Sequence, residues 1–280
     1  MTPPLSFGCE TAARRSFAVN GLTLRALEWG RPGRPGLVFL HGGSAHAHWF
    51  DLVAPAFASR YHVIALDQRG HGESDWPATP AYATQDFAGD LVGVLDALGW
   101  RQATFVGHSM GGHNSMSFAA WHPGRVAALC VVDSRPSIPA DRLHVMHRRG
   151  HRGFRRHPTL EAAVQSFHLL PPDTIADPAF LEHLGRSGVV ERDGAFLYRF
   201  DPGASGSRAP VDTMPLLEQI TAPTLLVRGE HSPVLPMATA AAMLERLRQA
   251  RLVEIPGAYH HLVLDAPDAF TRELAAFLAD

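Results

Sequence analysis

The sequence contains no lysine, so all 25 of its basic residues are arginine, and we draw no function from this bias. Cysteine is almost as scarce, with only Cys9 and Cys130, and no disulfide framework is indicated. Cys130 falls in an apolar run and is most simply a small buried side chain. The formal net charge of −2 gives no electrostatic reason to expect nucleic acid or an anionic membrane as a partner.

Long hydrophobic runs are also missing. The stretch MTPPLSFGCETAARRSF has no apolar run of signal-peptide length, and no later stretch approaches a membrane span. We therefore expect a cytoplasmic protein, whose oligomeric state the sequence does not indicate. What the 280 residues do supply is material for a core, since 46% are hydrophobic and 19% are charged, as in globular proteins.

Short apolar stretches alternate with amphipathic ones along most of the chain. A hairpin is predicted first, because Asn20-Gly21 joins RSFAV to LTLRALEW and tolerates the positive φ angles of a two-residue turn. The alternation that follows is typical of an α/β fold with a mostly parallel sheet and helices on both faces. It predicts strands over 36–40, 61–66, 103–107, 126–132, 224–228 and 251–255, and helical segments over 49–57, 86–98, 110–121, 238–248 and 267–278.

The alternation stops between Ser134 and about Ile220. This stretch contains helical patterns such as LEAAVQSFHLL and a turn-rich piece, DPGASGSRAP, after which strands and helices resume. We therefore predict an insertion over one edge of the sheet, residues 134–220, between core segments 1–133 and 221–280.

A candidate nucleophile lies in Gly107-His108-Ser109-Met110-Gly111, which fits G-x-S-x-G between a strand and a helix. Side chains two residues before or after the serine would clash with neighbouring backbone, which leaves glycine at both places. Ser109 is thereby lifted above the sheet, and the N–H groups of the helix start point towards negative charge. The alternative is a glycine-lined turn with an incidental serine.

Four stretches, in this order, resemble those of the α/β-hydrolase superfamily: LHGGSAHAHW, ALDQRGHGESD, VGHSMGG and IPGAYHHLVLDAPDAF. The resemblance covers about residues 16–133 and 221–280. It implies an α/β-hydrolase fold with an eight-stranded sheet, in which the insertion is a helical cap placed after strand 6. It also implies an oxyanion hole made by the N–H groups of Gly43, with Ser44 next to it, and of Met110.

A serine hydroxyl needs a base within hydrogen-bond reach. Of the 17 histidines, His260 follows the last predicted strand, where this family carries its base, and the next residue, His261, is its competitor. His41 and His108 are expected to organise loop backbone.

The carboxylate that should support His260 is displaced from its usual place. In Gly229-Glu230-His231-Ser232 the family's acid position holds Ser232, which cannot balance an imidazolium charge. Asp133, at the tip of the preceding sheet strand, is the candidate acid, and a capping or turn-forming aspartate is the alternative. Some branches of the superfamily relocate the acid there. Among them are E-2-(acetamidomethylene)succinate hydrolase-like enzymes, which DQRGHG, GHSMGGHNS, VVDSRP and VRGEHSPVL resemble. Glu230 is the reserve acid.

Two further polar groups have open roles. Asp67, Arg69 and Ser74 are expected to be structural, with an Asp–Arg pair and a hydroxyl holding the turn.

Between Arg135 and His157, seven arginines and four histidines accompany one acid, Asp141. They form either a solvated basic face or a clamp in which one or two arginines hold a substrate carboxylate. Phe167 could line the apolar part of the pocket, or simply pack within the insertion.

These features predict a serine hydrolase that cleaves a small carboxylic ester, lactone or amide through an acyl-enzyme, with carboxylate-bearing compounds among the candidate substrates. No metal or organic cofactor is expected, because neither HAH nor HRRGHRGFRRH pairs histidine with Asp, Glu or Cys at ligand spacing. The alternatives are a non-hydrolytic enzyme of the same fold, such as a cofactor-free dioxygenase or lyase, and a ligand-binding receptor with weak turnover.

Overall fold

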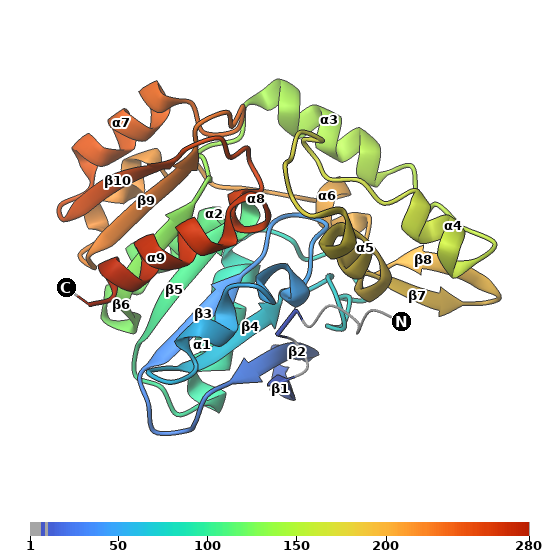
Figure 1. Ribbon diagram of the computed structural model, residues 1–280, viewed down its shortest axis with the longest axis horizontal. Helices are drawn as coiled ribbons and strands as arrows, with labels where there is room; N and C mark the ends of the chain where they lie inside the picture. The colour runs from blue at the N-terminus through green and yellow to red at the C-terminus, as the bar shows by residue number, and fades with distance from the viewer. Residues whose placement is uncertain (1–6, 9–10, 280) are drawn as a thin grey trace.

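The computed structural model describes residues 7–8 and 11–279, so Cys9 lies outside the described residues. Its central sheet has eight strands in the order β1-β2-β4-β3-β5-β6-β9-β10 (Figure 1). Strand β2 pairs antiparallel with β1 and β4, and the other pairings of this sheet are parallel, which confirms the predicted architecture. The strands are β1 (Ala13–Val19), β2 (Leu22–Trp29), β3 (Gly36–Leu40), β4 (His62–Asp67), β5 (Ala103–His108), β6 (Val126–Val132), β9 (Thr224–Gly229) and β10 (Ala250–Ile255).

Both faces of the sheet are covered, and every residue of β3, β4 and β5 is buried. Successive side chains of a strand point to opposite faces, so Phe105 and Val106 belong to different apolar clusters. The cluster around Phe105 includes side chains of α1 (Thr84–Ala97), α2 (Met110–Trp121) and α7 (Met237–Arg246). The cluster around Val106 includes those of α8 (Leu262–Asp265), α9 (Pro267–Phe277) and two 3₁₀ turns, Ala47–Phe50 and Ala54–Phe57, where one helical stretch was predicted.

Between β6 and β9 the chain leaves the sheet and forms a separate group of elements on one side of it (Figure 1). The group contains a two-stranded hairpin that the prediction did not include. Its turn, Asp193-Gly194, has φ angles of 49° and 68°, as Asn20-Gly21 has 51° and 76°, so the same sequence signal was present in both places. The elements are α3 (Ala140–Gly150), α4 (Leu160–Gln165), α5 (Pro178–Ser187), β7 (Val189–Arg192), β8 (Ala195–Tyr198) and α6 (Gly203–Gly206).

The turn after β4 is structural, but it is held differently from the prediction. The Asp67 carboxylate accepts hydrogen bonds from two backbone N–H groups, and the Ser74 hydroxyl donates to the Asp67 carbonyl. The predicted Asp67–Arg69 pair is wrong, because Arg69 donates two bonds of 2.6 Å to Asp90 of α1 instead. Asp90 offers both carboxylate oxygens to the planar guanidinium, whereas those of Asp67 are occupied by backbone. Within the described residues, no helix has the length and apolarity needed to cross a membrane.

Candidate active site

The turn between β5 and α2 places Ser109 at a sharp corner, with φ 52° and ψ −113°. A Cβ atom added to Gly107 would lie 2.4 Å from the Gly111 carbonyl oxygen, and one added to Gly111 would lie 2.2 Å from that of Leu40. No larger residue fits at either position without moving backbone. The Ser109 N–H donates to the Val132 carbonyl at 3.0 Å, which attaches the corner to the end of β6.

Three side chains from separate loops meet in one hydrogen-bonded chain at the carboxyl ends of the strands. His260 Nε2 lies 3.0 Å from Ser109 Oγ, and His260 Nδ1 lies 2.6 Å from Asp133 Oδ2. His260 and Asp133 are 3% and 0% exposed. The Asp133 carboxylate accepts a hydrogen bond from Nδ1–H of His260, which leaves Nε2 free to take the proton of the hydroxyl. The arrangement can therefore turn Ser109 into a nucleophile.

Asp133 is held by its neighbours in an unusual conformation, with φ 44°. Its N–H donates to the Val227 carbonyl at 2.7 Å, and Ser232 Oγ donates to the same Oδ2 atom that faces His260. The Val234 N–H in turn donates to Ser232 Oγ at 3.1 Å. Ser232, which occupies the family's usual acid position, thus contacts the Asp133 carboxylate directly, a contact that the sequence does not predict.

Glu230, the reserve acid, lies elsewhere. Its carboxylate accepts the Gly257 N–H at 2.8 Å, and its side chain is 45% exposed. No hydrogen bond joins it to His260 in the part of the chain that the structure describes.

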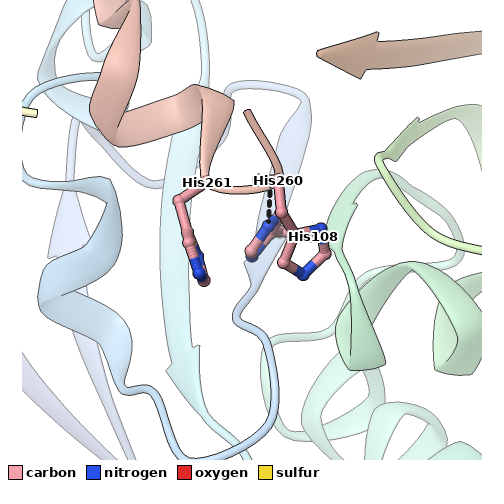
Figure 2. A group of neighbouring side chains, drawn as sticks. All are labelled: His108, His260 and His261. Carbon is pink, nitrogen blue, oxygen red and sulfur yellow. Dashed lines mark hydrogen bonds between the residues drawn. The ribbon is translucent and has the colours of Figure 1, made fainter. Parts of the chain in front are cut away.

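His108 and His261 both lie next to His260, each with its ring centroid 4.8 Å from that of His260, and their own centroids are 5.7 Å apart (Figure 2). His108 Nε2 donates to the His260 carbonyl at 3.0 Å, the loop-organising role expected of it, and His261 Nε2 donates to the Pro171 carbonyl at 3.1 Å. Burial first, and then the neighbouring histidines, hold the pKa of His108 well below its usual value. The same causes lower the pKa of His261 to about 3. Both neighbouring rings are therefore neutral near pH 7. His261, the competitor for the role of base, instead binds the Pro171 carbonyl of the insertion.

The other predicted loop histidine also binds backbone. His41 Nδ1 donates to the Gly42 carbonyl at 2.7 Å, and Nε2 accepts the Gln68 N–H at 3.0 Å. The His41 carbonyl accepts the Gly111 N–H at 3.1 Å, which joins this loop to the start of α2.

The residues predicted for the oxyanion hole lie beside this loop. Gly43 and Ser44 follow β3, are exposed, and line the same pocket as Ser109 and Met110. Met110 is the first residue of α2, so its N–H has no acceptor inside the helix. Backbone N–H groups of this kind can hold a developing negative charge.

Two groups of titratable side chains have ligand atoms within 4.8 Å of one another among the described residues: His108, His260 and His261, and also His48, Asp51 and His183. In the first group, both nitrogens of His260 already bond Ser109 and Asp133. In the second group, Asp51 Oδ2 accepts from His48 Nδ1 and His183 Nε2, at 2.8 Å each. That the protein needs no metal ion stays a prediction.

A pocket of about 780 Å³ lies over Ser109 and His260. The insertion supplies most of its lining, including Val145, Tyr198 and Phe200. Phe167 does not line it, because its ring packs near Trp49, with centroids 6.2 Å apart, and close to Gly185.

Arginines dominate the charged lining of the pocket, with Asp141 the only acidic lining residue in the described chain. Among the lining arginines that come from the predicted basic stretch, Arg142, Arg149 and Arg155 are exposed. Arg135 is partly buried, and its Nε donates to the Val234 carbonyl at 2.8 Å. Arg208, in the turn-rich piece of the insertion, also lines the pocket and is 3% exposed. The sequence does not predict this role for Arg208, because no pattern distinguishes one arginine in an irregular segment. The lining arginines are Arg135, Arg142, Arg149, Arg155 and Arg208.

Comparisons with known proteins show which family the chain resembles. The chain is 30% identical over 268 residues to 2-(acetamidomethylene)succinate hydrolase of Mesorhizobium japonicum, covering 94% of each chain. It is 30% identical over 254 residues to an esterase of Escherichia coli, covering 87% of this chain and 93% of that protein. The crystal structure of E-2-(acetamidomethylene)succinate hydrolase superimposes with a TM-score of 0.86 at 27% identity, over 96% of this chain and 100% of the other.

A match to a family model also covers most of the chain. Residues 35–267 match the family defined by the alpha/beta hydrolase fold, a span that includes Ser109, Asp133 and His260. The chain belongs to the α/β hydrolase fold family.

Proposed function

We propose that this hydrolase cleaves a small carboxylic ester, lactone or amide through an acyl-enzyme on Ser109. His260 Nε2 takes the hydroxyl proton as Ser109 Oγ attacks the substrate carbonyl carbon, and Asp133 stabilises the resulting imidazolium. The N–H groups of Gly43 and Met110 hold the negative charge of the tetrahedral intermediate.

The intermediate collapses when the carbon–oxygen or carbon–nitrogen bond breaks and His260 gives its proton to the leaving group. Water then attacks the acyl-enzyme, with His260 as base, and the carboxylic acid product leaves while Ser109 regains its proton. Every proton moves between His260, Ser109, water and the substrate. No step requires a metal ion or an organic cofactor.

One observation carries this proposal. The chain Ser109–His260–Asp133 is continuous, with contacts of 3.0 and 2.6 Å, and it lies under the pocket of about 780 Å³. The neutral rings of His108 and His261 add no positive charge next to His260, which favours its action as a base.

We further propose that the insertion, residues 134–220, acts as a cap that selects the substrate, since it contributes most of the lining residues. The name 2-(acetamidomethylene)succinate describes an acetamido compound with carboxylates. A carboxylate-bearing amide is therefore one of the substrate classes to test.

A fluorophosphonate probe tests the proposal, because it reacts with activated serine hydroxyls. We expect the native protein to be labelled and Ser109→Ala to be neither labelled nor active on short acyl esters, lactones and N-acyl compounds. A folded native protein that resists the probe and turns over none of these compounds would favour a ligand-binding receptor. Turnover that survives Ser109→Ala would favour a cofactor-free dioxygenase or lyase.

A further inference from the structure

Arg208 is a buried cation that forms no ion pair with an acidic residue of the described chain. Its side chain lines the pocket of Ser109, and the residue is 3% exposed. Nη2 donates to Asn114 Oδ1 at 2.8 Å, whereas the buried Nη1 atom has no hydrogen-bond partner among the described residues. None of the ion pairs formed by the described residues includes Arg208.

Such an arrangement is costly. An arginine is almost never fully buried unless it is paired, because taking a charge out of water without a counter-charge costs several kcal/mol in general. Burial lowers the pKa of Arg208 to about 10, so the guanidinium stays protonated near neutral pH. A residue that lines the pocket therefore carries a positive charge and a buried N–H group that no described residue binds.

The guanidinium is also held in place. Asn114 lies on α2, little more than one turn after Ser109, and its Nδ2 donates to Gln68 Oε1 at 2.8 Å, which orients the amide oxygen that Arg208 binds. Arg208 lies over the Phe87 ring, 4.6 Å from its centroid. His147 Nε2 of α3 donates to the Arg208 carbonyl at 2.8 Å. The side chain is thus held by Asn114 and Phe87, and its backbone by His147, so it loses little entropy when it binds a ligand.

We propose that Arg208 binds a carboxylate of the substrate, with its free Nη1 donating to the anion while Nη2 stays on Asn114. This inference rests on the proposed function, because Arg208 and Ser109 line one pocket. The substrate is then a small anionic compound whose carboxylate contacts Arg208 while its scissile carbonyl lies over Ser109. Unlike the exposed arginines at the pocket rim, Arg208 has no water shell to give up, so its bond to an anion contributes more to binding.

Two esters of matched size test the inference: mono-4-nitrophenyl succinate, which carries a carboxylate, and 4-nitrophenyl butyrate, which does not. In Arg208→Gln we expect kcat/KM for the anionic ester to fall about 100-fold, mainly through KM, and that for the neutral ester to change less than about threefold. Arg208→Lys should lose less, because it keeps the charge without the planar pair of donors. Arg152→Gln, an exposed arginine outside the pocket lining, should change neither value.

An equal loss for both esters would show that Arg208 only supports the fold, and the inference would be overturned. An unchanged value for the anionic ester would overturn it as well. If Arg208→Gln proves unstable in thermal unfolding, the Arg208→Lys variant decides by the same comparison between esters.

Direct binding separates this inference from the proposed hydrolysis. Succinate is titrated calorimetrically into Ser109→Ala and into Ser109→Ala/Arg208→Gln, neither of which needs to turn over. We expect succinate to bind the first and to bind the second at least tenfold more weakly. Equal binding to both, or binding to neither folded protein, contradicts the role of Arg208. A wild type that hydrolyses no ester but binds succinate through Arg208 contradicts the hydrolytic mechanism alone.

Discussion

At the scale of single residues, the site depends on backbone conformations that most side chains avoid. Ser109 and Asp133 both have positive φ angles, 52° and 44°. Such conformations cost free energy for residues other than glycine and persist only where the surroundings impose them. Here bonds to Val132 and Val227 attach both residues to neighbouring strand ends. Ser109 and Asp133 thus adopt these strained conformations at the place where their side chains both bind His260.

The choice of acid can be tested by matched substitutions. We expect Asp133→Asn to lower kcat by roughly 10³-fold or more, because an amide cannot hold the imidazole in the same tautomer or balance its charge. Glu230→Gln should leave kcat within about twofold, since Glu230 bonds the Gly257 N–H. Steady-state kinetics on one ester measures both. The reverse ranking would mean that Glu230 is the acid.

Ser232 is expected to act as a positioning residue through its bond to Asp133. Removing a hydrogen bond to a charged group costs about 1.5–3 kcal/mol. Ser232→Ala should therefore lower kcat roughly tenfold or more while KM stays unchanged, and Ser232→Thr should restore most of it. A change in KM alone, or no rescue by threonine, would assign the residue a structural role only.

At the scale of elements, the insertion is joined to the core by a charged contact away from Ser109. Asp51 is fully buried just after the 3₁₀ turn Ala47–Phe50, and it accepts hydrogen bonds from His48 and from His183 of α5. Burial of His48 opposes its charge, but the bond to Asp51 and the charge of Asp51 outweigh burial and raise the pKa of His48 above 6.5.

This contact predicts a pH dependence of stability. A raised pKa in the folded state contributes stability that is complete below the unfolded-state value and is lost as pH rises through the folded-state value. The difference in free energy of unfolding between wild type and His48→Gln should be larger at about pH 6 than at about pH 8.5. Urea titrations at both pH values measure it, with the exposed His144→Gln as control. A difference that grows with pH would contradict the assignment.

At the scale of the whole molecule, the charges are unevenly distributed. The formal net charge is −2, yet the pocket lining brings together five arginines and one aspartate within the described residues. A local excess of positive charge attracts anions over roughly a Debye length, about 10 Å at 0.1 M salt.

The ionic strength of the buffer should therefore affect substrates differently. Raising it from about 0.02 M to 0.5 M is expected to lower kcat/KM for mono-4-nitrophenyl succinate several-fold and to leave that for 4-nitrophenyl butyrate nearly unchanged. In Arg208→Gln, kcat/KM for the anionic ester should still fall as salt is raised, because the exposed arginines of the pocket lining, Arg142, Arg149 and Arg155, remain. The same salt response for both esters would mean that the field of the pocket does not guide the substrate.

Much of this protein follows from local patterns in its sequence. Apolar periodicity predicts the sheet and most of its covering helices, and the glycines around Ser109 predict the sharp corner, because backbone sterics act between near neighbours. The insertion was predicted as helical, although Asp193-Gly194 carried the hairpin signal.

Other features depend on contacts between residues far apart in the sequence. Arg69 bonds Asp90 rather than Asp67, and Phe167 packs near Trp49 instead of lining the pocket. Long side chains reach several neighbours, and only the packed fold decides which of them is chosen.

The sequence by itself determined the α/β architecture, the serine at its corner and a short list of histidines and acids that could serve it, since these depend on spacing along the chain. Only the tertiary structure decided that Ser232 bonds Asp133 and that Arg208 is buried with no ion pair to a described acidic residue. The physical reason is that burial and pairing of a charge depend on which distant segments exclude water from it, and chain folding alone brings those segments together.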